Sequence, residues 1–142
     1  MAFSVNEQQI TWSAASSISL NSTSRFNSDA VTLNAGDLHG SISLYADNSG
    51  TPASGDVVDV YIKWSNGDIL GDTGNDYDTD EHATWIGRLD TFSTNTPGED
   101  PAQMTVPVVW AGKTAFKLVA VAAQGGTRAI TFRARMNAHR WA

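Results

Sequence analysis

Residues 56–65, DVVDVYIKWS, decide the fold class of this chain. Apolar side chains recur there at every second position, and those that share one face are Val58, Val60, Ile62 and Trp64. Successive side chains of a β-strand point to opposite sides of a sheet, so a period of two indicates a half-buried strand. The stretch ITFRARMNAHR, residues 130–140, alternates in the same way. Its expected inward face is Ile130, Phe132, Ala134, Met136 and Ala138.

Turn residues separate the alternating runs. Asn66-Gly67 follows the first run directly, and QGGT at 124–127 predicts a tight hairpin, because glycine adopts positive φ without strain. Pro107 has no N–H to donate, so the run at 103–106 is expected at a sheet edge or at a strand end. We expect about eight strands, and they lie near residues 10–20, 30–33, 40–46, 57–65, 83–92, 103–109, 114–123 and 129–138.

Many short strands with turns between them predict an all-β domain. The favoured fold is a single-domain, jelly-roll-like β-sandwich, and the alternative is an immunoglobulin-like sandwich. Residues 1–24 differ from the rest, because they contain seven serines and only one charged residue, Glu7. We interpret them as a short N-terminal segment, either an edge strand or an arm that packs on a neighbouring subunit. Residues 25–142 then form the sandwich domain.

The composition and net charge of the chain argue against several classes of binding partner. The chain has 142 residues, a net charge of −6 and no cysteine, so thiolate metal sites and disulfides are excluded. Nucleic-acid binding usually requires a basic face, which argues against a nucleic-acid partner. No apolar run approaches the ~20 residues that span a bilayer, which argues against a membrane protein. The start, MAFSVNEQQI, also lacks the basic and apolar regions of a secretory signal.

The stretch SNGDILGDTGNDYDTDEH, residues 65–82, holds six acids and no lysine or arginine. Alternating acids in a flexible loop can bind calcium, and the candidates are Asp72, Asp76 and Asp78. The EF-hand pattern fits in no register, however, because the required glycine and glutamate positions are never both filled. The alternative is a solvated loop between two strands, which the Asn-Gly and Gly-Asp steps favour. We therefore commit to no metal or other cofactor.

Catalytic motifs are absent from the sequence. The three histidines, His39, His82 and His139, lie in separate segments. There is no G-x-S-x-G, no phosphate-binding loop and no H-E-x-x-H. We therefore expect the protein not to be an enzyme.

The C-terminal part has the opposite charge. Residues 112–142 contain six lysines and arginines and no acid, and Arg133, Arg135 and His139 share one face of the last predicted strand. Five tryptophans are many for this length; Trp64 and Trp85 are expected in the core, whereas Trp12, Trp110 and Trp141 lie near segment ends. Tryptophan and arginine are enriched at interfaces. The predicted partner or oligomer interface is Trp12, Lys117, Arg133, Arg135, His139, Arg140 and Trp141.

Four segments between residues 59 and 136 carry a family resemblance: DVYIKWSNGD, DYDTDEHATWIGRLDTF, NTPGEDPAQMTVPV and GTRAITFRARM. With them, this short, acidic, cysteine-free chain resembles the head decoration, or cement, proteins of tailed bacteriophages. The resemblance implies a virion structural protein, made in the host cytoplasm, that binds the outer surface of the capsid. It also implies a homotrimer that bridges subunits of the major capsid protein.

Two other interpretations stay open. A carbohydrate- or receptor-binding β-sandwich, assisted by calcium in the acidic loop, would use exposed aromatic side chains to stack on sugars. A head-to-tail connector or tail component has the same sequence character as a cement protein.

Overall fold

A computed structural model describes residues 3–21, 24–48, 50, 52–92, 101–123 and 129–141. Within these residues the chain forms strands and one short 3₁₀ helix, η1 (Asp80–His82), and no helix there is long and apolar enough to cross a membrane. The strands are β1 (Phe3–Gln9), β2 (Ile18–Asn21), β3 (Ser24–Asn27), β4 (Val31–Thr32), β5 (His39–Asn48), β6 (Val57–Ser65), β7 (Thr84–Asp90), β8 (Ala102–Val109), β9 (Ala115–Ala123) and β10 (Ala129–Trp141).

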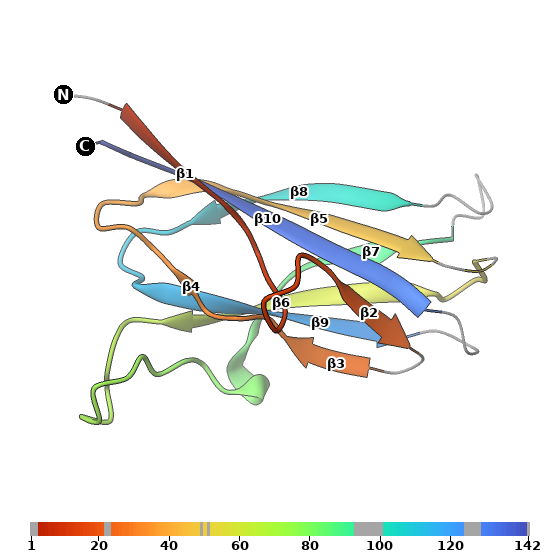
Figure 1. The fold of residues 1–142 in the computed structure, drawn as a ribbon, viewed down its shortest axis with the longest axis horizontal. Coiled ribbons are helices and arrows are strands. Elements are labelled where there is room, and N and C mark those ends of the chain that lie inside the picture. The colour runs from red at the N-terminus through yellow and green to blue at the C-terminus, as the bar shows by residue number, and fades with distance from the viewer. Residues whose placement is uncertain are drawn as a thin grey trace.

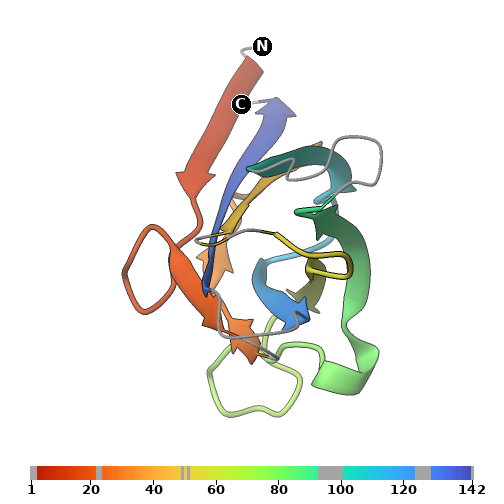
Figure 2. The same cartoon turned by 90° about the vertical axis from the view of Figure 1, so that its right-hand side faces the viewer.

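The strands form two antiparallel sheets that face each other across the core (Figures 1 and 2). The first sheet has the order β1-β10-β5-β8, and β2 continues the edge that β1 begins, because both pair with β10. The second sheet has the order β3-β9-β6-β7, and β4 lies next to β3 along β9. The all-β sandwich that the alternation predicts is thereby confirmed.

The pairing pattern is that of a jelly roll. Partners are nested along the chain: β1 pairs with β10, β3 with β9, β5 with β8 and β6 with β7. The chain thus resembles one long hairpin folded over into two sheets, which is the double-sheet architecture of jelly rolls. In an immunoglobulin sandwich the first and last strands lie in different sheets. Here they pair with each other, so the immunoglobulin-like alternative is wrong.

The core lies between the sheets and follows the predicted alternation. The inward face of β10 is buried at all five predicted positions, from Ile130 to Ala138. Val58, Val60 and Ile62 of β6 are fully buried, and Trp64 packs against them from the rim. Trp110 stacks on Phe116 with ring centroids 5.2 Å apart. This aromatic cluster fills one end of the core.

One predicted strand, 10–20, is wrong. Residues 10–17 form a tight turn between β1 and β2, in which Ser13 and Ala14 have φ of 48° and 68°. Their backbone N–H groups donate to the carboxylate of Asp29, at 3.1 and 2.8 Å. Left-handed backbone is uncommon at residues other than glycine and needs such compensation. Asp29 is 15 residues from Ala14 along the chain, so the local sequence did not predict the turn.

The described part of the predicted N-terminal segment belongs to the first sheet. All seven residues of β1 pair with β10, from Phe3 with Trp141 to Gln9 with Arg135. Within the described residues this is the edge-strand arrangement, and contact with a neighbouring subunit stays a prediction. At the opposite edge lies β8, where Pro107 confirms the expectation of an edge strand. The predicted 124–127 hairpin lies outside the described residues.

Candidate functional site

The first candidate surface feature is the acidic loop, which we define as residues 66–78, between β6 and η1. Its base is closed by backbone hydrogen bonds from Asp76 N–H to the Gly67 carbonyl and from Asp78 N–H to the Trp64 carbonyl, both 2.9 Å. Gly67 and Gly71 have φ of 110° and 78°, a conformation that glycine adopts readily. The loop leaves one end of the sandwich and returns to it (Figure 1).

Carboxylates hold the acidic loop in shape. Asp68 accepts backbone N–H groups from Gly71, Asp72 and Thr73, at 2.6, 3.1 and 2.7 Å. Asp76 Oδ2 accepts the N–H groups of two consecutive tip residues at 2.7 and 3.0 Å. Such aspartate-to-backbone contacts are the ones that favour turns. The acids therefore serve first as internal braces.

These braces shift one pKa. The N–H of Thr73, followed by those of Gly71 and Asp72, holds the pKa of Asp68 below its ordinary value of 3.8. The cause is that hydrogen bonds to a carboxylate stabilise the charged form. The ionised form of Asp68 is therefore the one that favours the ordered loop.

The structure changes the predicted calcium candidates. Carboxylate oxygens of Asp68, Asp72 and Asp76 lie within 4.8 Å of one another. Asp78, predicted as a ligand, instead accepts the N–H of Trp64 at 3.1 Å and does not join the group. Calcium prefers six to eight oxygens, and this group offers carboxylates that already accept backbone N–H groups. No metal is assigned, and calcium binding stays the open alternative, with Asp68 in place of Asp78 among the candidate ligands.

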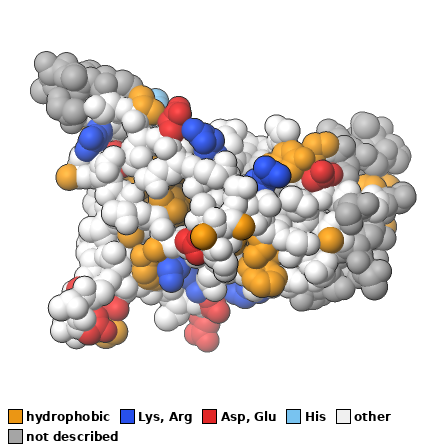
Figure 3. Space-filling view, in the orientation of Figure 1, with side chains coloured by type: hydrophobic (Ala, Val, Ile, Leu, Met, Phe, Trp, Pro, Cys, Tyr) orange, Lys and Arg blue, Asp and Glu red, His pale blue; other side chains and the backbone are white. Residues whose placement is uncertain are grey.

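Two aliphatic side chains stand at the tip of the acidic loop. Ile69 is 81% exposed and Leu70 is 74% exposed, the highest values among the large exposed hydrophobic residues. Figure 3 shows red acidic and orange hydrophobic side chains together at this protruding end. Because Asp76 fixes the backbone of both residues, the tip is displayed in a defined shape. A braced apolar tip surrounded by acids is suited to docking on another protein.

A pocket of about 250 Å³ lies at the base of the acidic loop and includes Trp64, Tyr77 and Lys113 in its lining. The ammonium of Lys113 lies 5.5 Å from the Trp64 ring, and that of Lys117 lies 4.7 Å from the Tyr77 ring. Both contacts are cation–π interactions. Sugars stack on open aromatic faces, so covered faces make this pocket a poor sugar site.

The outer face of the first sheet carries part of the predicted interface. A shallow groove of about 230 Å³ runs over β10, β5 and β8, and its outward-facing lining is Gln9, Ser43, Tyr45, Gln103, Arg133 and Arg135. Arg135 pairs with Glu7 at 3.2 Å. The side chain of Arg133 is exposed and makes no ion pair or hydrogen bond with any residue that the structure describes. The groove therefore presents one guanidinium that is free to meet an acid.

The remaining predicted interface residues lie apart. Lys117 is on β9 in the second sheet, against Tyr77. His139 pairs with His39 on the first sheet, with ring centroids 5.8 Å apart, and Arg140 donates to the Ala35 carbonyl at 3.2 Å. The backbone of Trp141 ends β10, and its side chain lies outside the described part of the structure.

Two tryptophans near segment ends lie inside the protein. Trp12 is 2% exposed and meets Phe132 edge to face, with ring centroids 5.6 Å apart, so it is a core residue and cannot serve the predicted interface. Trp110 is fully buried. Both lie just beyond a strand in the sequence yet pack into the core, so their positions in the sequence resembled interface positions.

Trp85, predicted in the core, is 56% exposed. A β-bulge explains the difference: Val60 pairs with Gly87 but Tyr61 pairs with Trp85, which leaves Ile86 as the extra residue. Without the bulge Trp85 would oppose the buried Ile62, whereas with it Trp85 lies on the outer face. Glycine inside a strand often marks a bulge, so Gly87 was the signal in the sequence.

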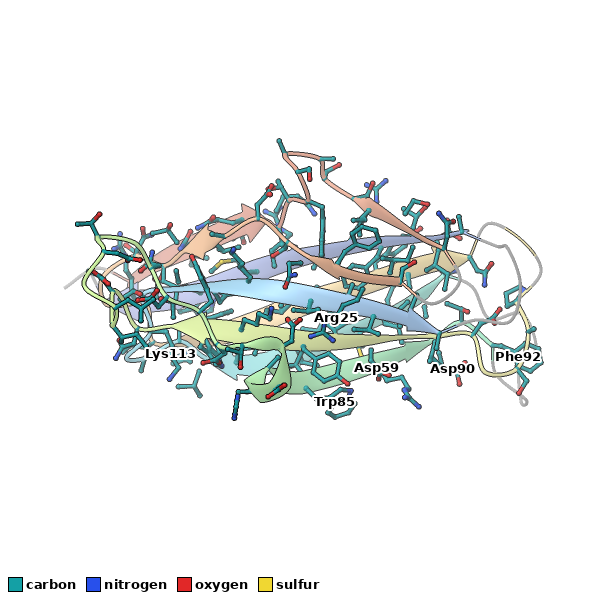
Figure 4. The ribbon with its side chains drawn as sticks, turned by 90° about the horizontal axis from the view of Figure 1, so that it is seen from below. Arg25, Asp59, Trp85, Asp90, Phe92 and Lys113 are labelled. Atoms are coloured by element: carbon teal, nitrogen blue, oxygen red, sulfur yellow. The ribbon has the colours of Figure 1, made fainter. Side chains whose placement is uncertain are left out.

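Trp85 is held in a fixed orientation by its neighbours. Its Nε1–H donates to Oδ1 of Asp59 at 3.1 Å, and Arg88 makes a two-pronged contact with the same carboxylate at 2.9 and 2.8 Å. Figure 4 shows Trp85 and Asp59 next to each other on neighbouring strands. The hydrogen bond from Arg88 lowers the pKa of Asp59. We name Asp59, Trp85 and Arg88 the Trp85 surface.

No protein-family model and no curated protein matches this chain. The candidate surfaces are therefore interpreted from their own geometry.

Proposed function

We propose that this protein is a non-catalytic virion structural protein that attaches to the outer surface of a tailed-phage capsid. In this role it bridges subunits of the major capsid protein, associates with copies of itself as a homotrimer, and needs no cofactor. The protein is made in the host cytoplasm and ends on the virion surface. Support comes from the resemblance of residues 59–136 to cement proteins and from a surface built for protein contact.

The observation that carries the proposal is the Trp85 surface. Trp85 is 56% exposed, so a large aromatic side chain is available to a partner at this surface. Tryptophan and arginine dominate the binding energy of protein interfaces, and a preset rotamer reduces the entropy lost on binding. Hydrogen bonds to Asp59 fix the side-chain orientations of both Trp85 and Arg88. We assign this surface to the capsid contact.

Rebinding to capsids tests the proposal. Capsids from the source of the protein, stripped of decoration, are mixed with the wild-type chain and with Trp85→Ala, and bound protein is measured after sedimentation. We expect Trp85→Ala to weaken attachment roughly tenfold or more, the cost of losing a hot-spot residue. Val109→Ala is the matched control, because Val109 is 68% exposed but lies on the other sheet. A wild-type chain that fails to bind such capsids contradicts the proposal.

A second candidate function has one favourable observation. The exposed ring of Trp85 could stack on a sugar, as expected for a carbohydrate- or receptor-binding module, with calcium at Asp68, Asp72 and Asp76. A glycan array with and without calcium separates the two functions. Strong hits that Trp85→Ala abolishes would favour the sugar-binding module over the capsid protein.

A further inference from the structure

The groove on the first sheet has the character of a receptor for an acidic, apolar segment. Its lining includes Arg133, Arg135, Tyr45 and Gln103. Cross-strand pairing places Arg133 opposite Tyr45, and Tyr45 opposite Gln103, in one row across three strands. The site is rigid because every wall is a paired strand. What the groove lacks is an anion for Arg133.

The acidic loop has the complementary character. It carries Asp68, Asp72, Asp76 and Asp78 and no lysine or arginine. None of these four acids makes an ion pair with a described residue, so their charge is available to a partner. Its tip, Ile69 and Leu70, supplies the apolar surface. The loop keeps this shape without a partner, since its own carboxylates brace it.

We propose that the acidic loop of one copy docks in the groove of a second copy, with Ile69 and Leu70 over Tyr45 and with Asp72 facing Arg133. This proposal deepens the self-association part of the proposed function and rests on it. The argument for a second copy is charge: the groove holds the exposed guanidinium of Arg133, which has no described ion pair, and the four acids of the loop make no ion pair with a described residue. An exposed cation and exposed acids on the same chain are complementary between copies.

The contact is heterologous, because the loop and the groove are different surfaces of the same chain. Heterologous contacts either close into a ring or continue as an open filament. Closure after three copies gives the homotrimer of the proposed function. Each copy in such a ring uses one loop and one groove, and the Trp85 surface on the second sheet stays free for the capsid.

A charge swap tests the contact directly. The full chain and its variants are studied by sedimentation velocity over a range of protein concentrations, at low salt and at about 0.15 M salt, where exposed charges are screened beyond about 8 Å. We expect Arg133→Glu and Asp72→Lys each to raise the concentration for half-association by about tenfold or more, because like charges then meet. The double variant Asp72→Lys/Arg133→Glu should regain most of the association. Higher salt should weaken the wild-type complex.

Two controls separate the contact from general effects. Glu81→Lys changes the net charge as Asp72→Lys does but lies in η1, outside the acidic loop, so its association should equal that of wild type. Leu70→Ser removes tip surface without altering charge and should weaken association. Circular dichroism verifies that each variant is folded; Arg133 and the Leu70 side chain have no described partner to lose.

The outcomes are decisive. A double variant that associates less well than either single variant overturns the loop-in-groove contact, as does a wild-type chain that is monomeric throughout. Capsid rebinding by Trp85→Ala is independent of this result. A monomer that binds capsids would refute the loop-in-groove contact and leave the capsid proposal in place. An oligomer that does not bind capsids would leave the contact in place and refute the capsid proposal.

Discussion

Trp85 and Trp110 show how one residue type takes opposite roles in this protein. Trp110 is fully buried and stacks on Phe116, so its side chain contributes to stability. Trp85 touches water on more than half of its surface and contacts Asp59 with its indole N–H. The difference is set by a single extra residue in β7, not by the chemistry of the side chain.

Alanine substitution should separate these roles. Truncation of a buried aromatic side chain typically costs 3–5 kcal/mol, so we expect Trp110→Ala to lower the free energy of unfolding by about 4 kcal/mol. Trp85→Ala should lower it by about 1 kcal/mol or less, as is usual for surface positions. Urea denaturation monitored by circular dichroism measures both. Equal losses would contradict the different burial of the two rings.

Asp68 should make the acidic loop sensitive to acid. Its pKa is lowered by the N–H of Thr73 and then by those of Gly71 and Asp72, so the charged form stabilises the folded loop. That contribution is present above the ordinary pKa of 3.8 and is lost as the pH falls through the lowered value. We expect the amide signals of residues 71–73 to titrate together with a midpoint below 3.8.

Nuclear magnetic resonance of the loop amides checks this. Asp68→Asn should remove the titration and speed hydrogen exchange of the same three amides. Asp90→Asn is a suitable control, because within the described residues the Asp90 side chain accepts the N–H of Phe92, at the other end of β7, and no amide of the acidic loop. A midpoint above 3.8 would mean that these hydrogen bonds do not form in solution.

Single residues also mark where sequence reasoning reaches its limit. The alternation of β6 and β10 identified their buried faces, because period two is a local property of the chain. The left-handed pair Ser13 and Ala14 was missed because its compensation comes from Asp29. The spacing of the acids in the sequence does not show which carboxylates lie together. Asp78 accepts the N–H of Trp64, whereas Asp68 lies close to Asp72 and Asp76.

Among the elements, strand β1 and the turn that follows it contribute differently to the stability of the fold. Among the described strands, β1 is an edge strand that pairs with β10 alone. The following residues Ile10 and Trp12 are 0% and 2% exposed and belong to the core. A truncation that tests the N-terminal segment must therefore stop before Ile10, because a longer one removes core volume as well.

Two truncations should differ sharply. Removal of residues 1–9 takes away an edge strand, whereas removal of residues 1–12 also takes away two core side chains. Loss of a buried isoleucine and a buried tryptophan costs at least about 5 kcal/mol together. We expect the longer truncation to unfold at much lower urea, or not to fold. Equal urea midpoints would show that Ile10 and Trp12 are not packed in the core.

For the whole molecule, the fold class was predictable and the site was not. Strand identity follows from local alternation, so most strands from 30 onward lie where the sequence places them. The nested order depends on pairing between distant segments, such as β1 with β10, which no local pattern encodes. The groove and the Trp85 surface exist only after sheets form, because their residues come from separate strands.

The pairing of the first strand with the last has a mechanical consequence. Phe3 and Trp141 are partners, so the two ends of the chain lie side by side (Figure 1). Tension applied to these two ends would break the hydrogen bonds between β1 and β10 one after another. This sequential opening requires little force. A load applied between the faces of the two sheets must instead separate many core contacts at once. A protein with this geometry resists tension when it is held by its faces and yields when it is held by its ends.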